Sequence, residues 1–322
     1  MPSVLRETLL YLSSQPRIFH FVRNNSLAQK LAERFVAGES LDETLGAVQA
    51  LNQKGMSASL DLLGESVHTE AEARAAGREY VRMLDRIRER SVDANVSVKL
   101  TAMGFDVAED MCVEILHDIV ARARDYGTFV RLDMESSAYA ERTLRLFYDR
   151  LYPAYPDNVG IVLQTYLRRT PSDVERAIQA HCRVRLCKGA YQEPSSVAFP
   201  DKRDVDATYA RCMERLMSDG NYPGLATHDE RLILHAKRYA AEHRIAPSRY
   251  EFQMLYGVRR DLQEALVRDG YRVRIYVPFG TQWYPYLMRR LAERPANLAF
   301  ITGNLLREIL GGRGGGGVRR AA

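Results

Sequence analysis

The stretch MSASLDLLG, residues 56–64, is followed by EAEARAAGREYVRMLDRIRER, residues 70–90, and then by NVSVKLT, residues 95–101. The first and third pieces are short apolar runs, which is typical of buried strands. The middle piece mixes charged and apolar residues at helical spacing, which indicates an amphipathic helix. A strand, a helix and a second strand in this order are the repeating unit of α/β folds.

The alternation of strand-like runs and helical segments continues to residue 278. Helical segments such as DATYARCMERLMSDG, residues 206–220, separate the runs. The further runs are TFVRLDM (128–134), GIVLQTY (160–166), CRVRLCKGA (182–190), GLATH (224–228), YEFQML (250–255) and VRIYVP (273–278). Eight strand–helix units over about 240 residues match the size of a TIM-type barrel. The sequence therefore predicts an α/β fold, a (βα)8 barrel preceded by extra helices.

A doubly wound open sheet is the structural alternative to the barrel. A dinucleotide-binding sheet of that kind normally carries a glycine-rich turn after its first strand. Here the first run is followed by Gly64, Glu65 and Ser66, with no GxGxxG nearby. The glycine-dense segment GGRGGGGVRRAA follows a helical pattern and precedes none. It is therefore interpreted as a flexible tail and not as a phosphate-binding loop.

Three regions are predicted along the chain. Residues 1–54 form a helical arm, because SLAQKLAERFVAG and SLDETLGAVQALNQKG each open on serine and end on glycine, which are capping residues. Residues 55–310 form the catalytic barrel. Residues 311–322 form the Gly/Arg-rich tail.

Composition excludes several classes of protein. The 322 residues are 46% hydrophobic and 27% charged, which fits a globular chain with a sizeable core. The formal charge of +5 is mild, and no basic stripe is interleaved with aromatic residues, so nucleic-acid binding is not expected. The four cysteines have no zinc-site spacing, and no metal is predicted.

Polar residues recur where the predicted strands end. The barrel strands are expected to be apolar through their middles, with the chemistry at their C-terminal ends. The polar residues assigned to these ends are Lys99, Asp133, Gln164, Arg185, Lys188, Tyr191, Thr227, His228, Gln253, Arg274 and Tyr276. Each one alone is typical of a cap or a loop contact. Seven strands with the same feature predict one polar face at the mouth of the barrel.

An arginine doublet follows the last strand, in YPYLMRRLAERPAN, residues 284–297. Arg289 and Arg290 are either solvated charges on a helix or a carboxylate clamp, because a guanidinium holds a carboxylate through two parallel hydrogen bonds. Together with Lys99 and Arg185 they favour a small acidic ligand. A glycosidase pair of Asp133 with Glu65 is a weaker alternative, because the surplus of cations suits an acid.

Nine pieces of the chain, in order from about residue 55 to 300, resemble the proline dehydrogenase family. They are SLDLLGE (59–65), SVKLTAMG (97–104), RLDMES (131–136), QTYLRRT (164–170), RLCKGAYQEP (185–194), ATHD (226–229), YEFQMLYGV (250–258), RIYVPFG (274–280) and YLMRRLAERPAN (286–297). The length resembles the monofunctional enzymes of that family. Two parts depart from the pattern or have no counterpart in it: Gln192 stands where many members carry an aromatic residue, and the Gly/Arg-rich tail has no equivalent.

The resemblance implies a distorted barrel that holds FAD and oxidises L-proline to Δ1-pyrroline-5-carboxylate, the first step of proline catabolism to glutamate. The resemblance also implies that hydride passes from proline C5 to flavin N5 and that a quinone accepts the electrons. The catalytic residues implied are Arg185, Lys99 and Asp133, with Arg185 near N5. The substrate-binding residues implied are Lys99, Asp133, Tyr191, Leu255, Tyr276, Tyr286, Arg289 and Arg290. The cofactor-binding residues implied are Gln164, Arg185, Lys188, Gly189, Ala190, Thr227, His228 and Gln253, and Glu65 with Arg289 forms a gate.

Another barrel enzyme that acts on a small carboxylate, such as a lyase with Lys99 as its Schiff-base amine, is the alternative function. Quinone use implies a membrane nearby. The sequence contains no run of 18 or more apolar residues, so a membrane-spanning helix is not predicted. Membrane contact is therefore expected to be peripheral. The expected compartment is the cytoplasm, at the inner face of the membrane, or the mitochondrial matrix if the chain is eukaryotic. A homo-oligomer is left open.

Overall fold

The computed structural model describes residues 33–64 and 67–293 of the 322-residue chain. Two compact units are present. Arg34–Thr281 forms one unit and contains all eight strands, whereas the other includes helix α12 (Trp283–Glu293). The first 32 residues and the tail 311–322 lie outside the described residues, so the predicted limits of arm, barrel and tail stay predictions.

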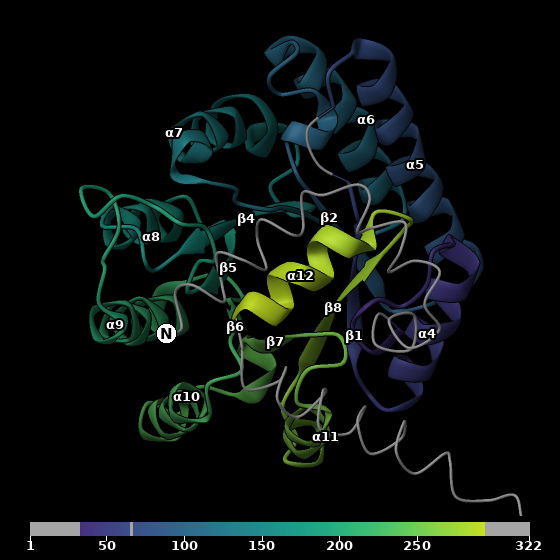
Figure 1. Cartoon of the computed structure of the whole chain (residues 1–322). Helices are drawn as coiled ribbons and strands as arrows, with labels where there is room; N and C mark the ends of the chain where they lie inside the picture. Colours follow the sequence, from purple (N-terminus) through teal and green to yellow (C-terminus); the bar gives the residue numbers. More distant parts are fainter. Residues whose placement is uncertain (1–32, 65–66, 294–322) are drawn as a thin grey trace, which may run out of the picture. The chain divides into compact units, whose positions relative to one another are not determined.

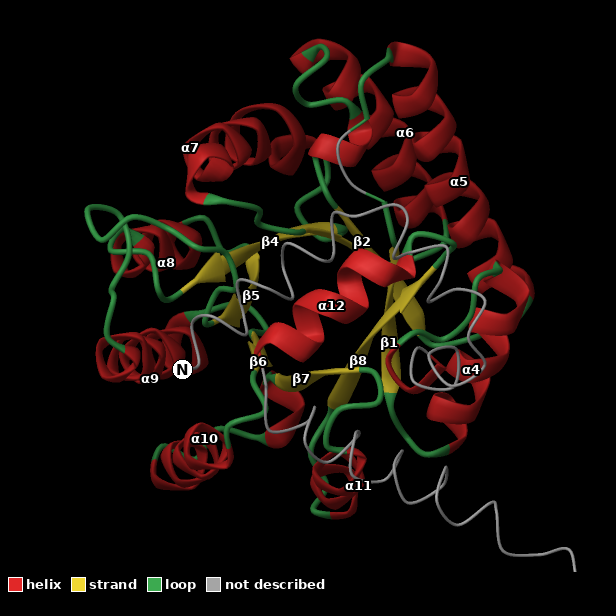
Figure 2. Cartoon of the chain, in the orientation of Figure 1, coloured by secondary structure: helices red, strands yellow, loops and turns green. Residues whose placement is uncertain are grey.

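Eight parallel strands close into a barrel in chain order, which confirms the predicted fold class. Figure 2 shows the strands in yellow. β1 pairs with β8 over six residues, from Ser57 opposite Arg274 to Leu62 opposite Phe279, and this pairing closes the ring. The strands are β1 (Ser57–Leu62), β2 (Ala94–Val98), β3 (Val130–Leu132), β4 (Val159–Gln164), β5 (Arg183–Cys187), β6 (Gly224–Ala226), β7 (Glu251–Leu255) and β8 (Val273–Phe279).

Helices of the barrel unit lie outside the ring of strands (Figure 1). They are α4 (Leu41–Gln53), α5 (Glu70–Glu89), α6 (Glu109–Asp125), α7 (Ser137–Leu146), α8 (Thr170–Gln179), α9 (Lys202–Asp219), α10 (Glu230–Glu242) and α11 (Arg260–Arg268). The predicted N-cap Ser40 begins α4 with a capping box: its side chain accepts from the Glu43 N–H, and the Glu43 carboxylate accepts from the Ser40 N–H. Local sequence therefore sets this helix start.

The barrel departs from regular geometry, as the resemblance implied. β3 and β6 have three residues each, whereas β8 has seven. A π-helical turn, Phe147–Leu151, and a 3₁₀ turn, Tyr152–Ala154, extend the connection between α7 and β4. The short strands leave loop residues such as Asp133 and Thr227 to continue the barrel wall.

The interior of the barrel is polar, which corrects the expectation of apolar strand middles. Successive residues of a strand face opposite sides, so Ala58 and Leu60 face the helices while Ser59 and Asp61 face inward. Both inward residues are fully buried. The strands do contain apolar residues, but these form the outward packing against the helices. Many of the other inward positions also carry polar side chains, among them Lys99, Arg131 and Arg185, and these make buried hydrogen bonds.

Gly160 on β4 gives space to an inward arginine. A Cβ at this position would lie 2.4 Å from the Arg183 carbonyl oxygen and 2.7 Å from Arg131 Nη1. Arg131 donates from Nη1 to the carbonyls of Ile161 and Arg183 at 3.1 and 2.7 Å. The absent side chain therefore lets one guanidinium serve two strand carbonyls.

Gly160→Ala is expected to destabilise the fold by about 3 kcal/mol or more, because the added methyl meets backbone that cannot move aside. Gly46→Ala in α4 is the matched control, since nothing lies within 4 Å of its Cβ position. That control should gain about 0.5–1 kcal/mol from helix propensity. Urea unfolding of the two variants measures both values, and equal midpoints would contradict the crowding at Gly160.

Candidate active site

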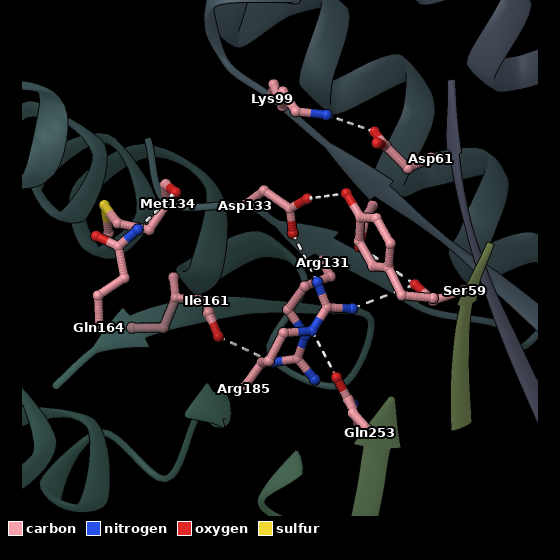
Figure 3. Close-up of polar contacts among 12 residues, drawn as sticks. Ser59, Asp61, Lys99, Arg131, Asp133, Met134, Ile161, Gln164, Arg185 and Gln253 are labelled. Carbon is pink, nitrogen blue, oxygen red and sulfur yellow. Dashed lines mark hydrogen bonds and ion pairs between the residues drawn. The ribbon is translucent and has the colours of Figure 1, made fainter. Parts of the chain in front are cut away.

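The guanidinium of Arg185 lies inside the barrel and is held by three side chains (Figure 3). Its Nε donates to Gln253 Oε1 at 2.5 Å, its Nη1 to Asp133 Oδ1 at 2.7 Å and its Nη2 to Ser59 Oγ at 3.3 Å. These bonds use three of the five N–H groups of a guanidinium. The cation is therefore fixed in orientation and still has donors for a ligand.

Asp133 joins Arg185 to Tyr276. One carboxylate oxygen accepts from Arg185, and the other accepts from Tyr276 Oη at 2.8 Å. The Tyr276 ring also lies against the cation, with its centroid 5.1 Å from the guanidinium carbon of Arg185. Burial and the Asp133 carboxylate raise the pKa of Tyr276 well above its ordinary value, so the phenol stays a donor. Three of the predicted residues thus form one rigid cluster.

Lys99 makes a buried ion pair with Asp61. Its Nζ lies 2.6 Å from Asp61 Oδ1, and the two side chains are 11% and 2% exposed. Burial alone would lower the pKa of Lys99, but the carboxylates of Asp61 and Asp133 outweigh burial and raise it above its ordinary value. Lys99 therefore stays a cation near neutral pH.

Glu251, the first residue of β7, anchors a second set of polar contacts. Its Oε1 accepts from Arg274 Nε at 2.8 Å and from Gln253 Nε2 at 2.6 Å. Arg274 also donates to the carbonyl of Ala58 at 2.8 Å. Arg274 is the second residue of β8, so it lies near the start of the strand. The run RIYVP indicates that this segment forms a strand, but it does not show which end of the strand each residue lies near.

Gln164 ends β4 with one polar atom unused. Its Nε2 donates to the carbonyl of Met134 at 3.1 Å, as Figure 3 shows. Its Oε1 is buried and finds no hydrogen-bond partner among the residues that the structure describes. A buried acceptor of this kind is normally satisfied, so it marks a place for a ligand donor.

The loop after β5 is shaped around Gly189. Its φ of +101° is a backbone conformation that glycine adopts readily and other residues rarely adopt. A Cβ at this position would also lie 2.2 Å from the Tyr166 ring. Lys188 points to two carboxylates, 2.5 Å from Asp206 and 2.9 Å from Asp229. Lys188, which is predicted to contact the cofactor, therefore also holds the carboxylates of Asp206 and Asp229 together.

The neighbouring loop after β6 carries the two other predicted residues. Thr227 Oγ1 accepts from the Asp229 N–H at 3.1 Å, so it shapes the start of α10. His228 Nε2 accepts from the Leu255 N–H at 2.9 Å, which requires this ring nitrogen to be unprotonated. The contact joins this loop to the end of β7.

Some predicted site residues fall outside the described residues, in the second unit, or in a loop at the surface. Glu65 lies outside the described residues. Tyr286, Arg289 and Arg290 belong to α12, in the unit that begins at Gln282, and the side chains of the two arginines lie outside the described residues. Tyr191 is half-buried and Ala190 is exposed in the loop after β5.

Sequence reasoning missed Ser59, Asp61, Arg131 and Glu251 as parts of the site. The available signal was the alternation of polar residues within buried runs, as in SASLDLL, where every second residue is hydrophilic. That pattern also describes a strand with one solvated face, so it does not by itself assign a polar interior. In the described part of the chain, no three His, Cys, Asp or Glu side chains are grouped as a metal site.

The acid stability of the protein is expected to depend on Glu251. Burial acts to raise the pKa of Glu251, but Arg274 and the donated hydrogen bonds lower it below 4.5. A lowered carboxyl pKa gives stability that is present above the unfolded pKa and lost as the pH falls below it. In Glu251→Gln, the slope of unfolding free energy against pH should be smaller below pH 4.5, by up to about 1.4 kcal/mol per unit. Equal slopes in urea unfolding at pH 3 to 5 would contradict this.

The chain is similar to known proteins over most of its length. A family model described as proline dehydrogenase matches residues 44–303. Proline dehydrogenase 1 of Bacillus subtilis subsp. natto is 39% identical over 306 residues, covering 95% of this chain and 100% of that protein. Proline dehydrogenase of Deinococcus radiodurans is 39% identical over 305 residues, covering 94% and 98%.

A solved structure shares the fold over most of the chain. The crystal structure of proline utilization A from Bdellovibrio bacteriovorus, inactivated by N-propargylglycine, has a TM-score of 0.79 and 27% identity. The match covers 89% of this chain and 35% of that much longer one. The two proline dehydrogenases, in contrast, are matched over nearly their whole length. The chain thus belongs to the proline dehydrogenase family and is an oxidoreductase of proline catabolism.

Proposed function

We propose that the chain binds FAD inside the barrel mouth and oxidises L-proline to Δ1-pyrroline-5-carboxylate, with a quinone as final electron acceptor. The observation that carries the proposal is the fixed cation Arg185 on β5 together with the unused acceptor of Gln164 on the adjacent strand β4, in a family of proline oxidoreductases. Bound flavin would supply the hydride acceptor, N5, and the route for the electrons to the quinone.

The residues present fit an isoalloxazine ring. Gln164 Oε1 lacks a donor among the described residues, and a flavin imide offers one. Arg185 brings a buried cation with two free N–H groups, which suits the negative charge that a flavin gains on reduction. Gly189 has no side chain to cover its backbone, so a cofactor can approach the loop after β5 closely. The other proposed cofactor contacts are Lys188, Ala190, Thr227, His228 and Gln253.

The substrate carboxylate is proposed to bind Lys99, Arg289 and Arg290. Asp61 holds the Lys99 ammonium in place, so this cation is ready before the substrate arrives. The two arginines are proposed from the sequence, with Glu65 as a gate that pairs with Arg289. Asp133, Tyr191, Leu255, Tyr276 and Tyr286 are proposed to enclose the ring.

The substrate amine must lose its proton before the bond between C5 and hydrogen breaks heterolytically. Among the inward residues whose contacts are described above, the cations Lys99, Arg131, Arg185 and Arg274 exceed the carboxylates Asp61, Asp133 and Glu251 by one. Burial and the nearby Arg185 lower the pKa of Arg131 to about 9, which still leaves it charged near neutral pH. An excess of positive charge favours the neutral amine, so the interior supports the deprotonation.

The Schiff-base alternative loses support from the same contacts. A Schiff-base lysine needs a lowered pKa and a free amine. Lys99 instead has a raised pKa and an ion pair with Asp61. We therefore do not favour a lyase.

Quinone use and contact with a membrane remain part of the proposal. Within residues 33–64 and 67–293, the structure contains no helix that is long and apolar enough to cross a bilayer. Peripheral contact at the inner face of the membrane and a homo-oligomeric state are proposed from the resemblance alone.

An anaerobic absorbance spectrum tests the proposed function. The purified protein, reconstituted with FAD if necessary, should show the visible band of an oxidised flavin. Adding L-proline should bleach the band, whereas L-alanine should leave it unchanged. A protein that binds no flavin, or a bound flavin that proline does not reduce, would overturn the proposal.

A further inference from the structure

We infer that Glu251 is a positioning residue, which sets the orientation of the Arg185 guanidinium through the amide of Gln253. The three side chains form a continuous buried chain from β7 to β5. Glu251 accepts from Gln253 Nε2 at 2.6 Å, and Gln253 Oε1 accepts from Arg185 Nε at 2.5 Å. All three residues are at most 6% exposed, so water does not replace these bonds. The inference concerns this geometry, and its effect on catalysis rests on the proposed function.

The orientation of the Gln253 amide follows from the charge of Glu251. A carboxylate only accepts hydrogen bonds, so the NH2 end of the amide must face Glu251. The carbonyl end then faces Arg185, which only donates. A flipped amide would place oxygen against oxygen on one side and N–H against N–H on the other. Glu251 and Arg185 therefore both favour the single orientation in which Gln253 holds Arg185, and Glu251 fixes the NH2 end of the amide.

Glu251 is itself fixed from two further sides. Arg274 Nε donates to Oε1 at 2.8 Å, and Tyr222 Oη donates to Oε2 at 3.1 Å. Gly224 on β6 supplies the space, because a Cβ there would lie 2.4 Å from Gln253 Nε2. The position of the amide thus depends on a neighbour that has no side chain.

A mobile Arg185 would lose the function proposed for it. Its two other partners, Asp133 and Ser59, hold the terminal nitrogens, whereas among the described residues Gln253 alone holds Nε. Releasing Nε lets the guanidinium plane turn about its other contacts. Small misplacements of a catalytic group cost about 10- to 100-fold in rate.

The direct test uses Glu251→Gln in the apoprotein and needs no flavin. A glutamine at 251 accepts or donates, so it no longer forces the Gln253 amide. The Arg185 Nε–H signal in a ¹⁵N spectrum, identified by its absence in Arg185→Lys, should exchange with water more than tenfold faster. Asp173→Asn, a buried carboxylate on α8 that pairs with Arg169, is the matched control and should leave the signal unchanged. An unchanged exchange rate in Glu251→Gln would overturn the inference.

Flavin potentials then separate positioning from a plain charge effect. Removing a negative charge should raise the flavin potential, whereas displacing the Arg185 cation should lower it. We expect a lower potential and a kcat reduced about tenfold in Glu251→Gln, with no further change when it is added to Arg185→Lys. Gly224→Ala, which changes no charge, should lower the potential in the same way. A raised potential, or an equal shift in the Arg185→Lys background, would count against positioning. A protein without flavin fails the proposed function and leaves the apoprotein test intact.

Discussion

Replacing Arg185 with methionine is expected to reduce kcat for proline oxidation by about 10²- to 10³-fold. The loss follows from removing a fixed cation beside the place proposed for the developing charge, where one preorganised donor is worth a factor of this size. The variant also leaves Asp133 as a buried carboxylate without its cation, which should destabilise the fold by about 3–5 kcal/mol. Stopped-flow reduction of the flavin by proline gives the rate, and urea unfolding gives the stability.

Arg183→Met is the matched control, because Arg183 precedes Arg185 by two residues on the same strand. Its guanidinium lies over the rings of Phe129 and Tyr222, at 5.2 and 5.5 Å from their centroids, and forms no ion pair in the described part of the chain. The control should change the rate less than about threefold, on the scale of an ordinary peripheral contact. Equal losses in the two variants would mean that Arg185 acts only through stability.

Alanine at Arg289 or at Arg290 is expected to raise KM for proline by about 10²- to 10³-fold while flavin stays bound. A charge-assisted hydrogen bond contributes about 1.5–3 kcal/mol, and a guanidinium gives a carboxylate two of them. The flavin spectrum should keep its intensity, because the proposed contacts of the two arginines are with the substrate. Titration with proline, followed by the change in flavin absorbance, measures the loss of binding directly.

Arg260→Ala, an exposed arginine at the start of α11, controls for a general change in surface charge. It should leave KM within about twofold, since distant surface charges are screened. Normal proline binding in both Arg289→Ala and Arg290→Ala would remove the carboxylate clamp from the proposed site. The remaining candidate for the carboxylate would then be Lys99 alone.

The fold was predictable because short apolar runs and capping residues indicate the strands and helices from local sequence alone. All eight strand-like runs are strands, and Ser40 with Glu43 sets the start of α4 as the serine predicted. The structure brings four of the residues singled out in the sequence, Asp133, Arg185, Tyr276 and Gln253, into contact in one interior. The family resemblance added the roles, which the residue types alone do not give.

The interior contacts were not predictable from the same sequence. Lys99 and Asp61 are 38 residues apart, and Arg185 and Gln253 are 68 apart, so no local pattern links them. Glu251 stands at the edge of an apolar run, where an acid ordinarily meets water. Its burial follows from the register of β7 against β8, which places Gln253 opposite Arg274. Register is a property of the closed sheet and appears only when the ring is complete.

Because Gly224 on β6 has no side chain, the amide of Gln253 on the adjacent strand β7 occupies the space that a side chain at 224 would fill. A protein engineer who shortens residue 253 would open a void, and an alanine at 224 is the natural filler for it. Libraries screened for stability would reject both changes when one position is varied at a time, whereas a paired library would recover the packing.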